Sequence, residues 1–324
     1  MTKRLSVFFE FLFFTLLIAF SLLLAFGKGY SFAVTDGIKL WAASVLPSLF
    51  PYFFIANLLS VNGGTGKLCL ALSPFTERLF KTGGPSGYAF FISLISGYPV
   101  GAKTVSDLKK SGLLTDTEAV RASAFCSTSS PMFLLSSVGN IMFNNNLFGI
   151  LLLVVHILSA VITGILFSFY KRSEHPSGHT GFTIKKTDNI LYESAYSAVI
   201  SVLVVGALIT IFYLLTEILY SLNIFNLPIK FLTAIFKDEN FAKGVVFGLF
   251  ECTKGLKALS LSSTKLFSLP IAAAIVGFGG LSVIVQSLCF LKSAKIKTAP
   301  FIFAKLTMSV ISFVLGLTLS FIYF

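Results

Sequence analysis

The chain has 324 residues, of which 55% are apolar and only 12% are charged. Soluble globular domains carry about a quarter charged residues, so this composition excludes a water-soluble enzyme, a disordered protein and a nucleic-acid binder. The net charge of +12 and the mean hydropathy of +0.89 instead fit a membrane protein whose Lys and Arg residues lie in cytoplasmic loops.

Seven apolar stretches are predicted to cross the membrane. The first, residues 7–26, follows Lys3 and Arg4 and is longer than the apolar core of a typical signal peptide, so we expect it to be retained. Lys and Arg residues are in excess on the side that this N-terminus shares, which predicts a cytoplasmic N-terminus. The other six predicted spans are residues 38–60, 116–140, 147–170, 195–221, 268–290 and 301–324.

Two further apolar stretches, residues 87–97 and 244–253, are too short to cross. At 1.5 Å per residue, about ten residues reach only about half of a ~30 Å hydrocarbon core. Each stretch is followed at once by a glycine-containing break and a second short segment. This pattern predicts two re-entrant hairpins.

The same order of elements occurs twice along the chain: a span, a connection, a hairpin, an interrupted span and a whole span. We therefore expect an N-terminal helix with an outer loop (1–37), repeat one (38–170), a cytoplasmic linker (171–189) and repeat two (190–324). Each repeat crosses three times, an odd number, so the second must be inverted, an arrangement typical of secondary transporters. The predicted fold is an all-α polytopic membrane protein with about seven transmembrane helices plus two re-entrant hairpins in an inverted repeat.

The first hairpin breaks within SGYPVGAK, residues 96–103. Gly97 and Gly101 permit backbone angles that other residues resist, and Pro99 suits the start of a new helix. The free amides of that helix start would attract an anion or a hydroxyl, and Lys103 would add positive charge. Alternatively, Lys103 extends to the cytoplasm or pairs with Asp107, one turn further on.

The first interrupted span breaks at CSTSSP, residues 126–131. Four consecutive hydroxyls are difficult to satisfy in lipid, so they are predicted to face a polar cavity and hydrogen-bond a solute. Ser130 before Pro131 is typical of a helix N-cap followed by a first helical residue. The alternatives are a kink in which the hydroxyls bond back to carbonyls of their own helix, and packing of small residues against a neighbouring helix.

The second hairpin and the second interrupted span also break at polar or glycine-rich positions. Glu251 lies where the hairpin turns inside the membrane, so it is predicted to bind a coupling proton or cation, or the solute. The alternative is a structural pair with Lys254. The last break, residues 277–282, would expose backbone carbonyls, with Gln286 following on one face.

Other ionisable residues in apolar stretches carry less information. Glu10 and Lys305 are expected to extend to the inner surface, and His156 to be packed and hydrogen-bonded rather than to relay protons. Paired carboxylates, a Ser-His-Asp set and a metal-ligand pattern do not emerge from the sequence, so an enzyme is not expected.

Four runs of sequence resemble the YlbJ/SpoVV-like sporulation integral membrane protein family, in the nucleoside recognition (Gate) domain group. They are LPSLFP (46–51), SGYPVGAK (96–103), FCSTSSP (125–131) and GLFECT (248–253). The resemblance implies a plan similar to that of concentrative nucleoside transporters. It also implies a transporter or channel for a small anionic aromatic solute, dipicolinic acid, in the bacterial cytoplasmic membrane or the outer forespore membrane during endospore formation. A nucleoside-type transporter and a non-transporting sporulation scaffold remain alternatives.

The expected partners are a small-molecule solute and the lipid bilayer, not nucleic acid, and the sequence leaves a homo-oligomer open. No cofactor is expected beyond a coupling proton or cation at Glu251. The predicted solute-binding residues are Gly97, Tyr98, Pro99, Gly101, Lys103, Ser127, Thr128, Ser129, Ser130, Glu251, Thr253, Gly279, Gly280 and Ser282.

Overall fold

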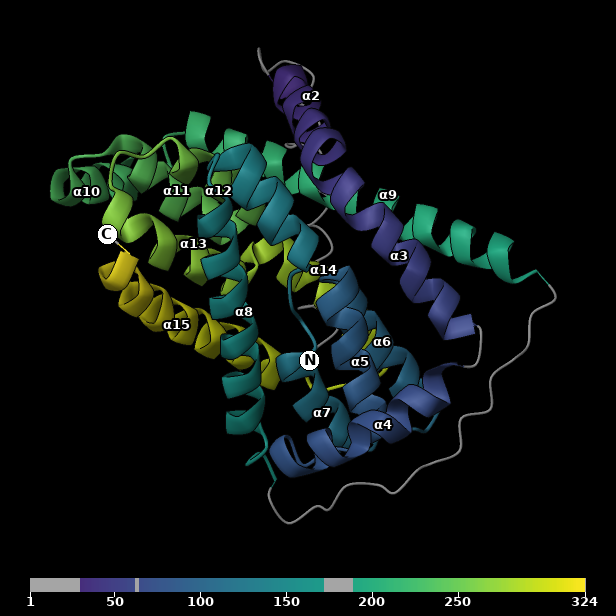
Figure 1. Cartoon of the computed structure of the whole chain (residues 1–324). Coiled ribbons are helices and arrows are strands. Elements are labelled where there is room, and N and C mark those ends of the chain that lie inside the picture. The colour runs from purple at the N-terminus through teal and green to yellow at the C-terminus, as the bar shows by residue number, and fades with distance from the viewer. Residues whose placement is uncertain (1–29, 62–63, 172–188, 324) are drawn as a thin grey trace, which may run out of the picture.

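The computed structural model describes residues 30–61, 64–171 and 189–323, and all regular elements in these ranges are helices (Figure 1). The predicted span 7–26, Glu10 and most of the linker lie outside the described residues. Four described helices are long and apolar enough to cross a membrane: Asn146–Phe167, Ile190–Ser221, Lys265–Ser293 and Thr298–Ile322. The protein is therefore a polytopic membrane protein that is all-helical over the residues the structure describes.

The first half starts with a helix that is longer than the predicted span 38–60. It runs without interruption through a π-helical turn, and Pro51 lies within it. The elements of this half are α2 (Tyr30–Leu40), η1 (Trp41–Val45), α3 (Leu46–Val61), α4 (Gly64–Leu79), α5 (Gly84–Ser96), α6 (Val100–Lys110), α7 (Asp116–Phe125), η2 (Phe133–Met142) and α8 (Asn146–Phe167).

The second half repeats the order of long helix, short helix, two helices in succession, an interrupted helix and a long helix. Its elements are α9 (Ile190–Ser221), α10 (Asn226–Phe236), α11 (Glu239–Phe250), α12 (Cys252–Ser260), α13 (Lys265–Phe278), α14 (Gly280–Ser293) and α15 (Thr298–Tyr323). In both halves the short helix, α4 or α10, occupies a stretch that the sequence predicts only as a connection, because each is too short to span. The two halves pack together: α9 lies along α2 and α3, and α15 packs on α8 as well as on α13 (Figure 1).

A carboxylate ties the base of each hairpin to the start of the interrupted helix that follows. In the first half, Glu118 on α7 accepts the Gly83 amide before α5 at 2.9 Å and the Thr115 amide at 3.0 Å. In the second half, Asp238 caps α11 through the Phe241 amide at 2.9 Å and accepts the Ser263 amide before α13 at 2.6 Å.

The two carboxylates reach their partners in opposite directions along the chain. Glu118 belongs to the later helix and reaches back, whereas Asp238 belongs to the hairpin and reaches forward. Burial raises the pKa of the Asp238 carboxyl, but hydrogen bonds from the Phe241 amide and from Ser263 outweigh it and hold this pKa below its ordinary value. Both hairpins are therefore anchored at the base, while their tips lie inside the molecule.

Glycine allows close backbone contact around each hairpin. In the first half, a Cβ on Gly101 would overlap the Cys126 carbonyl oxygen, so α6 can lie against the end of α7 only with glycine there. In the second half, a Cβ on Gly255 would overlap Gly248, so this pair brings the two arms α11 and α12 together. Both hairpin tips are thereby fixed deep in the bundle.

Candidate functional site

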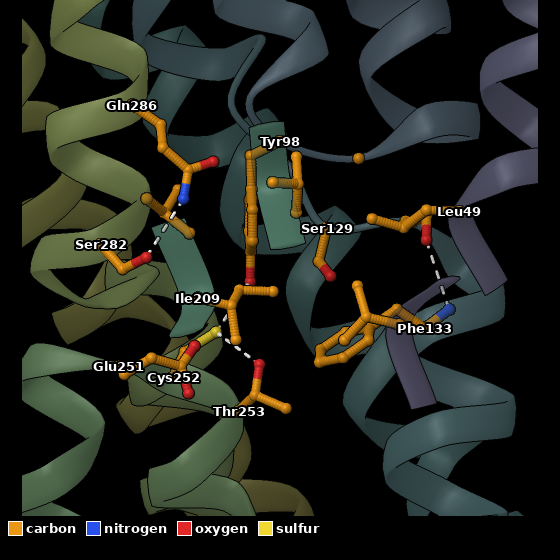
Figure 2. A pocket seen from close by; sticks show the side chains of 15 residues that line it. Leu49, Tyr98, Ser129, Phe133, Ile209, Glu251, Cys252, Thr253, Ser282 and Gln286 are labelled. Atoms are coloured by element: carbon orange, nitrogen blue, oxygen red, sulfur yellow. Dashed lines mark hydrogen bonds between the residues drawn. The ribbon is translucent and has the colours of Figure 1, made fainter. Parts of the chain in front are cut away.

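Four interruptions in helices, far apart in the sequence, meet at one cavity. They are the tip between α5 and α6, the break between α7 and η2, the tip between α11 and α12, and the start of α14; η1, α3 and α9 complete the wall (Figure 2). The cavity is lined by Val45, Leu49, Gly97, Tyr98, Ser129, Ser130, Phe133, Val205, Ile209, Glu251, Cys252, Thr253, Ser282, Val283 and Gln286.

The first hairpin tip brings Tyr98 into the cavity. Gly97 has a φ of 79°, and a Cβ there would lie 2.9 Å from the Ser130 amide nitrogen, so the tip lies directly on the first break. Tyr98 stands in the middle of the site, with its hydroxyl 3.7 Å from the Cys252 sulfur on the second hairpin (Figure 2). The tips of the two hairpins therefore touch through this pair.

The hydroxyls of the first break divide between structural and solute-facing positions. Ser130 Oγ accepts the Phe133 amide at 3.3 Å, which confirms the predicted N-cap before Pro131. Thr128 is held by Ser93 of α5, through both its hydroxyl at 2.8 Å and its amide at 3.0 Å. Among the four hydroxyl residues, Ser129 and Ser130 line the cavity.

His156 supports this break from α8. It is 1% exposed, and its Nε2 accepts the Ser129 amide at 2.8 Å, so the prediction of a packed, hydrogen-bonded histidine is confirmed. Its Nδ1 is buried and makes no hydrogen bond with the described residues. The imidazole therefore has one nitrogen without a partner among the described residues.

Glu251 lies at the second hairpin tip, where it caps α12. Its side chain is buried, and Oε2 accepts the Lys254 amide at 2.6 Å. The alternative ion pair with Lys254 is wrong: the Lys254 ammonium instead donates to Glu217 on α9 at 2.7 Å. Within the described residues no basic side chain lies within ion-pair distance of Glu251, so a carboxylate with no cationic partner lines the cavity.

Two polar residues of α14 complete the polar part of the lining. Gln286 donates through Nε2 to Ser282 Oγ at 3.1 Å, and its Oε1 is buried and has no hydrogen-bond partner in the described part of the chain. Figure 2 shows both side chains on the side of Tyr98 that faces α14. The free amide oxygen is an acceptor for a solute hydroxyl or N–H group.

Lys305 is the residue that sequence reasoning missed. The expectation that it extends to the inner surface is wrong: it is 0% exposed in the middle of the bundle, because α15 packs across α7 and α8. Its ammonium donates to the Ser127 carbonyl oxygen at 3.0 Å and lies 5.5 Å from the centre of the Tyr98 ring. An ionisable residue in an apolar span is itself a signal of function, and that signal was present in the sequence.

The structure brings half of the predicted solute-binding residues to the cavity: Gly97, Tyr98, Ser129, Ser130, Glu251, Thr253 and Ser282. Lys103 lies elsewhere, on an exposed side of α6, where it pairs with Asp107 at 3.2 Å as the alternative predicted. The others surround the cavity without lining it: Pro99, Gly101, Ser127, Thr128, Gly279 and Gly280.

The cavity is small in this state. Its volume is about 30 Å³, which is room for about two water molecules. An aromatic solute needs several times this volume, so the elements around the cavity must separate before such a solute can enter.

A search of curated proteins finds a relative that is 28% identical to this chain over 303 residues, covering 86% of this chain and 74% of its own length. It is "Sporulation integral membrane protein YlbJ" of Bacillus subtilis (strain 168). The chain is therefore similar to the YlbJ-like family over most of its length. This finding agrees with the four runs of sequence that resemble it. Neither a family model nor a solved structure matches the chain.

Proposed function

We propose that this protein is a membrane carrier for a small anionic aromatic solute, dipicolinic acid, and that it acts during endospore formation. The single observation that carries the proposal is the meeting of four helix interruptions at one cavity inside an apolar bundle. Interrupted helices around a central site are the usual construction of secondary transporters. The sporulation role follows the name of the relative. The proposed location of the protein is the outer forespore membrane, with the N-terminus in the cytoplasm.

The lining supplies two kinds of contact to such a solute. Tyr98 and Phe133 offer aromatic faces for a ring. Ser129 and Thr253 offer hydroxyl donors, one from each half of the chain. Movement of one half against the other would open the closed cavity to either side of the membrane in turn.

Glu251 gives this carrier a place for a coupling proton. A carboxylate in the wall repels a dianion, and protonation removes this repulsion. A proton taken up at Glu251 together with the solute therefore accounts for an acidic residue in a site for anions. On this proposal, the Glu251→Gln variant still transports the solute, but its transport no longer depends on protons.

A second candidate solute is a nucleoside. The unpartnered Oε1 of Gln286 and the carboxylate of Glu251 are two acceptors in one wall, which suits ribose hydroxyls better than carboxylates. The two candidates differ in charge, so the charge of the solute decides between them.

Uptake into proteoliposomes tests the proposal. Purified protein is reconstituted, and the entry of labelled dipicolinate and of labelled uridine is compared at several external pH values. We expect dipicolinate uptake that rises with an inward proton gradient and falls at least about tenfold in Ser129→Ala, with Ser260→Ala, an exposed hydroxyl on α12, as the control. Uptake of uridine alone favours the nucleoside carrier, and uptake of neither solute overturns the carrier in favour of a scaffold.

A further inference from the structure

The closed cavity lacks two properties that a site for an aromatic anion needs. Its volume of about 30 Å³ is too small for an aromatic ring, and the one acidic side chain in its lining, Glu251, has the wrong sign of charge. Polar groups near the cavity that the proposed function does not yet use are therefore of interest. Lys305 is the first of them, because it is a cation buried beside a residue of the lining.

The Lys305 ammonium has spare hydrogen-bonding capacity. It carries three N–H donors, and its single hydrogen bond within the described residues goes to the Ser127 carbonyl oxygen. No described carboxylate lies within ion-pair distance of it. A cation buried without an anion in a membrane protein is costly, and such residues commonly serve as counter-ions for a ligand or an ion pathway.

Two further polar atoms without partners lie beside the same break. Ser127 Oγ and His156 Nδ1 are buried, and neither makes a hydrogen bond with the described residues. Ser127 provides the carbonyl for Lys305, and His156 binds the amide of Ser129, two residues along. One short stretch of backbone thus gathers an ammonium, a hydroxyl and an imidazole, each with unused capacity.

Tyr98 connects this group to the cavity. Its side chain lines the cavity, and Lys305 lies over its ring. The ring packs against the apolar core, and its polar contacts are a cation–π contact with Lys305, a hydroxyl–thiol contact with Cys252 and a hydrogen bond with Ser129. Displacement of this one side chain would both enlarge the cavity and expose a positive charge to it.

We propose that Lys305 is the counter-ion for a carboxylate of the transported solute, and that Tyr98 covers it until the solute enters. This inference rests on the proposed function and adds the residue that selects an anion. The carboxylate takes the unused N–H donors of Lys305. Ser127 Oγ and His156 Nδ1, which have no hydrogen-bond partner among the described residues, are further donors on residues that belong to or contact the same break. Lys305 contacts the first break and Glu251 lies on the second hairpin, so the cation and the carboxylate come from different elements.

Binding of a matched pair of ligands to the purified full-length protein tests this assignment. The probes are dipicolinate and its uncharged diamide, pyridine-2,6-dicarboxamide, which has the same shape. The variants are Lys305→Gln, which keeps a donor for Ser127, and Lys305→Met, which needs no partner, each checked by its unfolding temperature without ligand. The control is Lys257→Gln, which removes an exposed ammonium from α12.

The expected result is that the unaltered protein prefers dipicolinate over the diamide by about 10- to 100-fold. Either Lys305 variant that retains the unfolding temperature loses that preference and still binds the diamide, while Lys257→Gln keeps it. A folded Lys305 variant that retains the preference overturns the counter-ion role and leaves the carrier intact. Failure of the unaltered protein to bind either probe overturns the proposed solute itself.

Discussion

The two interrupted helices are held open by different means. At the break between α7 and η2, side chains from three other helices take the free backbone groups: Ser93 accepts the Thr128 amide, His156 accepts the Ser129 amide and Lys305 donates to the Ser127 carbonyl. At the break between α13 and α14, Gly279 and Gly280 adopt φ values of 84° and 73°. There the backbone itself lies against the second hairpin tip.

This difference between the two breaks explains where the polar side chains around the cavity are found. The break held by polar side chains gathers hydroxyls, an imidazole and an ammonium. At the break held by glycine the backbone makes the contact, and the polar side chains of Ser282 and Gln286 follow on α14. The last helix of each half contributes to the first break, His156 from α8 and Lys305 from α15. The second half therefore supplies a charge to the first, and the first half supplies Tyr98 to the second hairpin through Cys252. The polar centre depends on both halves together.

The largest effect on stability is expected at the base of the second hairpin. Asp238→Asn removes a carboxylate that accepts several hydrogen bonds, including those of the Phe241 and Ser263 amides, and should lower the free energy of unfolding by about 3 kcal/mol. In Glu118 the Gly83 and Thr115 amides bond different carboxylate oxygens, so Glu118→Gln, the matched change at the first hairpin, should cost less. Equal losses in thermal unfolding would contradict this ranking.

The Asp238 carboxylate also predicts how stability depends on pH. Because the pKa of Asp238 is depressed in the folded protein, its stabilising contribution is present above the ordinary pKa of an aspartate and is lost as the pH falls through the folded value. The unaltered protein should therefore lose stability in acid more steeply than Asp238→Asn does. Parallel pH profiles for the two proteins would contradict the depressed pKa.

At the break between α13 and α14, Gly280→Ala should lower the free energy of unfolding by about 2 to 3 kcal/mol. A Cβ there would lie 3.1 Å from the Cys252 nitrogen and from the Gly248 carbonyl oxygen, in addition to the strain of a positive φ. Gly112→Ala is the matched control, since Gly112 has a φ of 74° and nothing within 4 Å. Its cost, about 1 kcal/mol, measures the strain alone, and an equal loss in both variants would show that the close contact at Gly280 does not matter.

At the side-chain-held break, His156→Leu should lower stability by about 2 kcal/mol, because the buried Ser129 amide loses its acceptor. His156→Gln is the control, since an amide oxygen can accept the same hydrogen bond. Thermal unfolding in detergent distinguishes the two, and a Leu variant as stable as the Gln variant would mean that the hydrogen bond contributes nothing.

Much of this site follows from local sequence. The hairpin arms and the breaks were predictable because Gly, Pro and runs of Ser interrupt an otherwise apolar pattern, and the Ser130 cap follows from the residue that precedes Pro131. Partners far apart in sequence were not predictable. Spacing paired Lys254 with Glu251, but the carboxylate turns to the backbone at the helix start, and the ammonium reaches Glu217 on α9. For the same reason, the contact of Lys305 with Ser127 could not be predicted from the sequence.

The smallest effect is expected at Lys103. Its ammonium pairs with Asp107 on the surface, with 41% of the Lys103 side chain and 56% of the Asp107 side chain exposed, so Lys103→Gln should cost about 0.3 kcal/mol or less. Its uptake of dipicolinate should match that of the unaltered protein, in contrast to Ser129→Ala. A loss of uptake in a stable Lys103 variant would return this residue to the site that the sequence predicted.

Cross-linking of the two hairpin tips tests the central claim most directly. Tyr98→Cys is paired with the native Cys252 in a protein whose Cys69, Cys126 and Cys289 are replaced by Ala, and a short thiol cross-linker is added in membranes. Mass spectrometry should recover a peptide that joins residues 98 and 252, and the link should be absent when Tyr98 is retained. If no such peptide forms although both thiols react with a monofunctional reagent, the tips do not meet and the cavity is not where the solute binds.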